Sequence, residues 1–239
     1  TVIMHKIKTW RNPYDEGFST CRRKEVEFKP GLTVLVGCNG SGKSTMLKNI
    51  KEELHKEKIP MFFYNNEHDG GSNSIGESVF LGDINFAATA WTSSEGENIT
   101  LNLSKIASKW RNFILTGEVN DVSTKFAKSF REACDIDNKK ITSKKRFISK
   151  KRFILLDAMD SGYSIDNVIE MKSLFDLVLK DSEKMGMETY IIVSSNEYEL
   201  ACNTDCFDVT EGKYINFSSY EDFKKFILHT RKKKDKRYK

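Results

Sequence analysis

The sequence predicts an α/β fold in which helices flank a mostly parallel central sheet. Short apolar runs rich in β-branched residues recur along the chain, and amphipathic segments with helical spacing separate them. A glycine-rich loop joins one of these runs to a helical segment. A content of 38% hydrophobic and 31% charged residues over 239 positions is that of a globular chain. We expect one domain over residues 1–230, with an insertion at about 117–151 and a basic tail at 231–239.

The elements of the N-terminal half follow from their apolar patterns. Alternation and β-branched runs predict strands at Val2–Trp10, Lys24–Phe28, Leu32–Val36 and Met61–Tyr64. The apolar residues after the glycine-rich loop recur at helical spacing, which predicts a helix with one buried face from Lys43 to about Lys58. A further helix is expected from Glu97 to about Leu115.

The C-terminal half continues the alternation. We expect a helix at Ser123–Ala133, a strand at Arg152–Leu156, a helix at Ser164–Lys184 and a strand at Thr189–Ser194. Glu211-Gly212 predicts a hairpin of Cys206–Val209 and Lys213–Phe217, after which Ser218 would cap a last helix. An antiparallel element is expected near each edge of the sheet. The hexapeptide SKKRFI occurs twice in tandem, at 143–148 and 149–154, and only the second copy leads into a buried strand.

Composition and cysteine spacing exclude several classes of protein. No apolar run approaches the roughly 18 residues that a membrane span needs. The first residues alternate apolar and polar side chains without the apolar core of a secretion signal. The five cysteines form no CxxC pair and have no histidine at zinc spacing. We therefore expect a cytoplasmic protein with reduced thiols.

Residues Gly37–Ser44 (GCNGSGKS) match the pattern G-x-x-x-x-G-K-[ST] between a buried strand and an amphipathic helix. Glycines let such a loop turn its N–H groups toward phosphate oxygens, and the helix start adds positive potential. Lys43 is expected to reach the β- and γ-phosphates, and the Ser44 hydroxyl to ligate Mg²⁺. The residues expected to bind ATP here are Asn39, Gly40, Ser41, Gly42, Lys43, Ser44 and Thr45.

An acid follows the apolar strand Phe153–Leu156, at Asp157. Burying an unpaired carboxylate is costly, so this position favours a functional role. We expect Asp157 to hold Mg²⁺, directly or through water.

With these residues in place, the segment 37–47 (GCNGSGKSTML) resembles the ATP-binding cassette superfamily, and within it the SMC and RecF-like head domains. The stretch Ile7–Asn12, followed by Pro30-Gly31-Leu32, resembles that branch's N-terminal strand, which implies that Arg11 lies near the nucleotide. Ser94-Glu95-Gly96-Glu97 resembles the signature motif, which implies that Ser94, Gly96 and Glu97 face the γ-phosphate of ATP held by a second subunit. Asp157-Ala158-Met159-Asp160 resembles the D-E-x-D of SMC heads. The resemblance implies a P-loop NTPase fold, ATP with Mg²⁺ and an ATP-dependent dimer with itself or a related subunit.

The chain departs from this family at the catalytic positions. Ala158 stands where the family has the glutamate that activates water, and an alanine has no group to do so. Ser195 or Asn196 stands at the switch histidine, which leaves Asp160, Ser195 and Asn196 as candidate catalytic residues. After Met61–Tyr64, where the family places a glutamine, the chain offers Asn65, Asn66 and Glu67, of which Asn66 is the candidate metal contact. No heptad repeat is present, so the chain would be a head without coiled-coil arms.

Three functions remain open. The first is an ATPase that dimerises around ATP, with slow or partner-stimulated hydrolysis, and acts on DNA. The alternative is an ATP-gated module that binds a protein or DNA partner without turnover, and the third is a P-loop nucleotide kinase. A DNA contact would use two basic segments: residues 139–152 hold eight Lys or Arg and no acid, and residues 231–239 hold seven and one acid.

Overall fold

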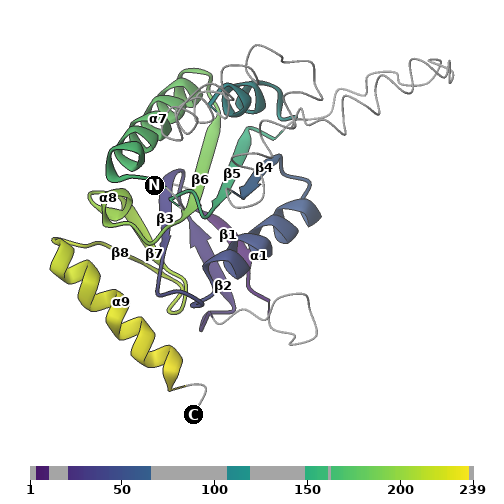
Figure 1. Ribbon diagram of the computed structural model, residues 1–239. Helices are drawn as coiled ribbons and strands as arrows, with labels where there is room; N and C mark the ends of the chain where they lie inside the picture. The colour runs from purple at the N-terminus through teal and green to yellow at the C-terminus, as the bar shows by residue number, and fades with distance from the viewer. Residues whose placement is uncertain (1–3, 11–20, 66–106, 119–148, 161–162, 237–239) are drawn as a thin grey trace, which may run out of the picture.

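The strands form one six-stranded sheet and one two-stranded sheet (Figure 1). The computed structural model describes residues 4–10, 21–65, 107–118, 149–160 and 163–236. Along the larger sheet the order is β4 (Met61–Asn65), β5 (Lys151–Asp157), β6 (Glu188–Ser194), β3 (Gly31–Val36), β7 (Asp205–Asp208) and β8 (Lys213–Ile215). All neighbours from β4 to β7 pair in parallel, and β8 pairs antiparallel with β7. The expected mostly parallel sheet and C-terminal hairpin are confirmed.

The first two strands, β1 (His5–Lys8) and β2 (Glu25–Phe28), pair antiparallel as a separate sheet. Both are shorter than the predicted Val2–Trp10 and Lys24–Phe28. Ile7, Val26 and Phe28 point inward at every second position and are almost fully buried, while the residues between them are exposed. This alternation is the period of a strand with one buried face.

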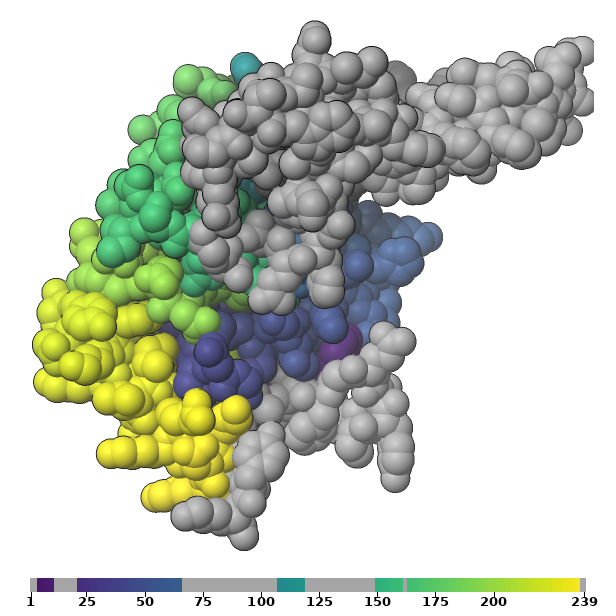
Figure 2. All heavy atoms as spheres, in the orientation of Figure 1, coloured from purple at the N-terminus to yellow at the C-terminus, as the bar shows by residue number. Residues whose placement is uncertain are grey.

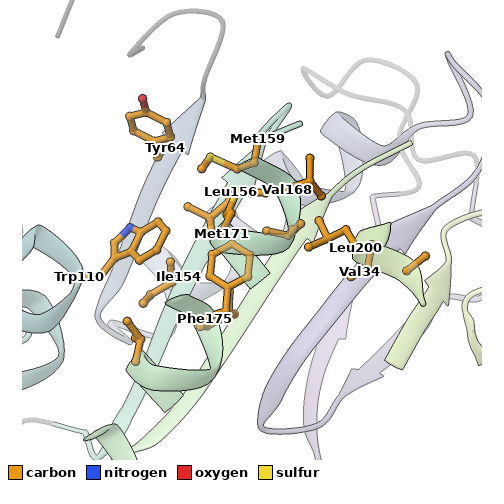
Figure 3. Close-up of a cluster of buried hydrophobic side chains, with 14 of the residues drawn as sticks. Val34, Tyr64, Trp110, Ile154, Leu156, Met159, Val168, Met171, Phe175 and Leu200 are labelled. Carbon is orange, nitrogen blue, oxygen red and sulfur yellow. The ribbon is translucent and has the colours of Figure 1, made fainter. Parts of the chain in front are cut away.

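Two hydrophobic clusters lie on opposite faces of the larger sheet. Along β5, Ile154 and Leu156 belong to one cluster, and Phe153 and Leu155 to the other. The same alternation holds along β3 and β6, because successive side chains of a strand point to opposite faces. Figure 3 shows part of the first cluster, in which Met171 and Phe175 pack over Ile154 and Leu156. A sheet buried on both faces explains why these strands are continuous apolar runs.

Helices supply the other half of each cluster. The apolar residues of α1 (Lys43–Lys56) join the cluster that also includes β1 and β2. On the opposite face lie α7 (Ile165–Lys184), α8 (Tyr198–Ala201) and the helical segment 107–116. The helix predicted from Glu97 is described only from residue 107, where Trp110 and Phe113 are buried. The helix predicted at Ser123–Ala133 lies outside the described residues.

The last helix, α9 (Tyr220–Asp235), begins one residue later than predicted. Ser219 is its N-cap, and its hydroxyl accepts from the Asp222 N–H at 3.2 Å. Ser218 was the predicted cap, but it lies outside the helix and instead donates to the Asp222 carboxylate. The helix continues through Asp235, so residues 231–235 of the predicted tail are helical. None of the described helices is long and apolar enough to cross a membrane.

Arg152, in the second copy of SKKRFI, is a buried cation at the start of β5. Its Nε donates to the Ile114 carbonyl at 3.0 Å, and a terminal nitrogen donates to the Ser149 and Lys151 carbonyls at 2.5 and 3.0 Å. Burial lowers the pKa of this guanidinium. Arg152 therefore ties the helical segment 107–116 to the sheet, and it is not exposed on the basic segment 139–152.

Candidate phosphate-binding site

The site lies where three parallel strands end. The strands β3, β6 and β5 are consecutive neighbours in the sheet, so their carboxyl ends meet at one edge. Such an edge is where α/β sheets bind ligands. The chain leaves β3 at Val36 into the glycine-rich loop, leaves β5 at Asp157 and leaves β6 at Ser194. Because β6 lies between the other two, the residues after Ser194 lie between the loop and the acid.

The loop has the backbone conformation that its glycines allow. Gly37, Gly40 and Gly42 have φ of 150°, 74° and 102°, a region that other residues rarely adopt. A Cβ at Gly37 would lie 2.4 Å from the Ser41 Oγ, so only glycine fits there. The first turn of α1 has no acidic residue, and its N-cap Gly42 has no side chain to bond the helix N–H groups. The start of α1 is therefore available to an anion.

Lys43 lies across the loop. Its Nζ donates to the Gly37 carbonyl at 2.8 Å, to the Cys38 carbonyl at 3.4 Å and to the Asn196 Oδ1 at 2.9 Å. Burial lowers the pKa of the Lys43 ammonium, while the nearby Asp160 and Asp157 carboxylates oppose that shift. The ammonium is thus bonded to neutral oxygens in a partly desolvated place. Phosphate oxygens are stronger acceptors for such a cation.

Asp157 is buried at 4% exposure and accepts three hydrogen bonds. The Ser44 Oγ donates to its Oδ1 at 3.0 Å, the Ser194 Oγ to the same oxygen at 2.5 Å, and the Asn65 Nδ2 to its Oδ2 at 3.4 Å. The predicted pairing of Ser44 with Asp157 is therefore present. Asn66, the predicted metal contact, lies outside the described residues, and the preceding Asn65 reaches the acid. Ser194 was not predicted as a site residue.

The donor set fits a magnesium ion. The Ser44 hydroxyl and the Asp157 carboxylate offer hard oxygen ligands 3.0 Å apart. Among the described residues no three His, Cys, Asp or Glu side chains gather into a metal-binding group. Magnesium commonly uses one or two protein oxygens and completes its shell with phosphate and water. A hydroxyl and one acid are enough for that mode of binding.

The three candidate catalytic residues lie together at the ends of β5 and β6. Asp160 Oδ2 accepts from the Ser195 Oγ at 2.9 Å and from the Asn196 N–H at 2.7 Å. Ala158 has φ of 53°, and its N–H donates to the Ser194 Oγ at 3.0 Å. In this arrangement Asp160 holds the loop after β6. Both of these bonds use the Oδ2 of the carboxylate.

Asn196 connects that loop to the phosphate loop. Its Nδ2 donates to the Asn39 Oδ1 at 2.9 Å, while its Oδ1 accepts from Lys43. The Asn196 side chain is exposed, as are Asn39 and Ser44. One exposed amide therefore contacts two residues of the predicted phosphate site.

Two contacts come from the far end of the chain and were not predicted. The Cys38 N–H donates to the Thr230 Oγ1 at 3.1 Å, and the Lys234 Nζ donates to the Asn39 carbonyl at 3.0 Å. Both side chains lie on α9, which passes beside the loop in Figures 1 and 2. Cys38, Cys21 and Cys206 are buried and form no disulfide within the described residues. No pattern in the sequence links α9 to a loop about 190 residues earlier.

The remaining predicted residues divide into two groups. Ser41 and Thr45 lie in the loop and in the first turn of α1, as expected. Arg11, which was expected near the nucleotide, lies outside the described residues. The signature residues Ser94, Gly96 and Glu97 lie outside them too, as does most of the insertion and Cys134.

Two solved structures are similar to this chain. No family model and no curated protein matches the sequence. Among solved structures, a nucleotide-free ATP-binding cassette from an ABC transporter aligns with 96% of this chain and 99% of its own, at 15% identity and a TM-score of 0.42. An ATP-binding cassette of an ABC transporter in its ADP conformation aligns with 97% and 98%, at 14% identity and a TM-score of 0.43.

Proposed function

We propose that this chain is an ATPase of the ATP-binding cassette type, which binds ATP with Mg²⁺ at the loop Gly37–Ser44. One observation carries the proposal: the Ser44 Oγ lies 3.0 Å from the Asp157 Oδ1. The hydroxyl belongs to the last residue of the phosphate-loop motif, which follows β3. The carboxylate ends β5, which lies two places from β3 in the sheet. A loop match alone is a pattern, whereas the convergence of these two groups is the geometry that a magnesium–triphosphate site needs.

Each residue has a part in binding. The N–H groups of the loop and of the first turn of α1 would bind phosphate oxygens, and Lys43 would exchange its contacts with Gly37 and Asn196 for the β- and γ-phosphates. Ser44 and Asp157 would hold Mg²⁺, with Asn65 or Asn66 close to it. When bound, the ion neutralises charge on the phosphates. Asn196 would then contact the terminal phosphate in place of a histidine.

A second copy of the chain is part of this proposal. Asn39, Gly40, Ser44 and Asn196 are exposed, so a single copy leaves the phosphate site open on one side. The resemblance to SMC-like heads implies that Ser94, Gly96 and Glu97 of another copy close it over ATP. Ser94 lies outside the described residues, so the dimer stands on the resemblance and on the open site.

The order of strands supports the cassette type over a nucleotide kinase. The strand β6 separates β3 from β5, and Ser194, Ser195 and Asn196 at its end contact Asp157, Asp160 and Lys43 in turn. The resemblance implies that the switch residue of a cassette follows this strand, at Ser195 or Asn196. Of the basic stretch 144–152 that would have to act as the arginine lid of a kinase, the structure describes residues 149–152, where the arginine, Arg152, is buried.

A second candidate is an ATP-gated binding module without turnover, and Ala158 favours it. General base catalysis contributes about 10²–10⁴-fold to a rate, and alanine contributes none of it. The nearest other acid, Asp160, accepts two hydrogen bonds from the loop after β6. Release of phosphate by the wild type distinguishes slow hydrolysis from no hydrolysis.

The test measures phosphate release and molecular mass together, with Mg²⁺ and ATP, for the wild type, Lys43→Met and Ala158→Glu. A cassette-type ATPase predicts release that Lys43→Met abolishes, and an ATP-dependent dimer that Ala158→Glu does not prevent. The module without turnover predicts ATP-dependent dimers and no release by the wild type. A wild type that binds no ATP, or that stays monomeric with ATP even as Ala158→Glu, would refute the binding proposal or the dimer respectively.

Contact with DNA stays a prediction from the sequence. Within the segment 139–152, Arg152 is buried, so it is not a free surface cation. The variant to make therefore neutralises Lys144, Lys145, Arg146, Lys150 and Lys151 and keeps Arg152. If the segment binds DNA, the variant binds more weakly and with a shallower dependence on salt. Unchanged binding would exclude this segment.

A further inference from the structure

The C-terminal end of α9 lies against the phosphate loop (Figures 1 and 2). Thr230 and Lys234 are four residues apart, so they share one face of the helix. Thr230 is buried at 6% exposure, accepts from the Cys38 N–H at 3.1 Å and donates to the Ile227 carbonyl at 2.8 Å. Lys234 donates to the Asn39 carbonyl at 3.0 Å. The loop therefore has a second neighbour besides the loop after β6.

The basic residues near this end of α9 do not have the same partners. Lys233 lies 3.0 Å from Glu211, and Arg231 lies 3.4 Å from Asp235. Lys234, in contrast, bonds a neutral carbonyl, and no carboxylate of the described residues lies within 4 Å of its ammonium. The end of a helix also carries partial negative charge, which would repel a bound polyphosphate. An unneutralised ammonium at this end offsets that repulsion.

The Lys234 ammonium lies very close to the backbone of the phosphate loop. A Cβ at Gly40 would lie 2.4 Å from the Lys234 Nζ, so the ammonium touches the backbone that would bind phosphate. Asn39, which it contacts, is also bonded to Asn196, and Asn196 to Lys43. The two ammonium groups thus lie at the two ends of one short chain of contacts across the site. A lysine side chain is long and flexible enough to change its partner without moving the helix.

We propose that Lys234 is a second cation of the triphosphate site, which exchanges the Asn39 carbonyl for the terminal phosphate of bound ATP. The inference rests on the proposed ATP binding at Gly37–Ser44. Thr230 sets the position of the side chain, because it fixes α9 to the Cys38 N–H. The ligand class is a nucleoside triphosphate, since a diphosphate lacks the third phosphate that this exchange requires.

The experiment is a calorimetric titration of ATP and of ADP, each with Mg²⁺, into the wild type, Lys234→Ala, Lys234→Arg and Lys233→Ala. We expect Lys234→Ala to weaken ATP about tenfold and ADP less than about threefold, as the loss of one charged contact to the terminal phosphate. Lys234→Arg keeps the charge and should restore most of the affinity for ATP. Lys233→Ala is the matched control, since Lys233 bonds Glu211, and it should change neither affinity.

Each outcome has one meaning. Equal ATP affinity in Lys234→Ala and Lys233→Ala, together with a clear loss in Lys43→Met, overturns the role of Lys234 and leaves the proposed function standing. Equal weakening of ATP and ADP by Lys234→Ala also overturns it, because the contact would not be with the terminal phosphate. A wild type that binds neither nucleotide overturns both proposals. Thermal unfolding of all four proteins without nucleotide should coincide, which excludes a general loss of folding.

Discussion

Replacing Lys43 by methionine separates the contribution of this side chain to folding from its contribution to triphosphate binding. Without a ligand, Lys43 bonds only neutral oxygens, and burial lowers the pKa of its ammonium. The charged form is therefore held at some cost to the folded protein. Methionine keeps most of the length and removes the charge. The variant loses three hydrogen bonds, each with a net contribution of about 0.5–1.5 kcal/mol, but it also loses the cost of burying the cation. We expect the unliganded variant to unfold within about 1 kcal/mol of the wild type.

The bound state should respond differently. A charged hydrogen bond contributes about 1.5–3 kcal/mol, so loss of the Lys43 contact with phosphate weakens binding at least about tenfold, and about thirtyfold for 2 kcal/mol. At ATP one hundred times above the wild-type Kd, ligand stabilises the wild type by about 2.7 kcal/mol and such a variant by about 0.9 kcal/mol. A chain of this size gains about 2–4 °C in Tm per kcal/mol. The increase in Tm caused by ATP should therefore be about 5–10 °C for the wild type and about 2–3 °C for Lys43→Met.

The assay is thermal unfolding with and without ATP and Mg²⁺, at one protein concentration. Lys48→Met is the matched control, because Lys48 is exposed on the same helix and should behave as the wild type. Two results would refute the reasoning. A Lys43→Met protein with the full shift would show that Lys43 does not contact the ligand. A variant that is already several kcal/mol less stable without ATP would show that the lysine is structural.

Three further predictions concern the frame of the site. Burial, with Lys151 nearby, lowers the pKa of His5 from 6.5 to about 4, so between these values the unfolded chain takes up a proton that the folded chain does not. The free energy of unfolding, measured by denaturant titration, should therefore fall by about 2–3 kcal/mol between pH 7 and 4.5. His5→Leu should remove most of that fall. Arg152→Met loses the bond to the Ile114 carbonyl and should lower the free energy of unfolding in urea by about 1–3 kcal/mol, whereas Lys150→Met, at an exposed position, should not. Gly37→Ala places a methyl group 2.4 Å from the Ser41 Oγ at a φ of 150°. This change should lower the free energy of unfolding by at least about 1–3 kcal/mol and weaken ATP binding. Both effects would be measured by thermal unfolding, as a lower Tm and a smaller increase in Tm on addition of ATP.

The parts of the site that the sequence could predict are those that local patterns encode. Lys43 and Ser44 belong to a contiguous motif, and Asp157 ends a run of apolar residues, a position visible without any partner. Sheet order follows less directly, yet alternating strands and helices were sufficient to predict parallel neighbours with their carboxyl ends at one edge. The predicted meeting of Ser44 and Asp157 depended on no other information.

The contacts that could not be predicted join residues far apart in the chain. Ser194 looks like the last residue of an apolar strand, and only the pairing of β6 beside β5 brings its hydroxyl to Asp157. Thr230 and Lys234 lie on a basic helix whose sequence suggests a solvated tail. Their contacts with Cys38 and Asn39 depend on where α9 packs, which helical spacing does not encode. The cap at Ser219 rather than Ser218 is a different kind of error, since two adjacent serines offer equivalent caps.

The end of β6 connects the predicted phosphate site to the two acids at the end of β5. Ser194, the last residue of β6, and the next two residues, Ser195 and Asn196, bond Asp157, Asp160 and the phosphate loop in turn. A triphosphate that draws Lys43 away from the Asn196 Oδ1 changes the third contact, and an ion at Asp157 changes the first. The backbone N–H of Asn196 also donates to the Asp160 Oδ2, so the residue that contacts Lys43 also contacts Asp160. Occupancy of the phosphate loop would therefore be transmitted to the end of β5 through hydrogen bonds alone, with no group that titrates near neutral pH. Such a device suits a chain that uses ATP to change its shape or its partner more than one that depends on rapid hydrolysis.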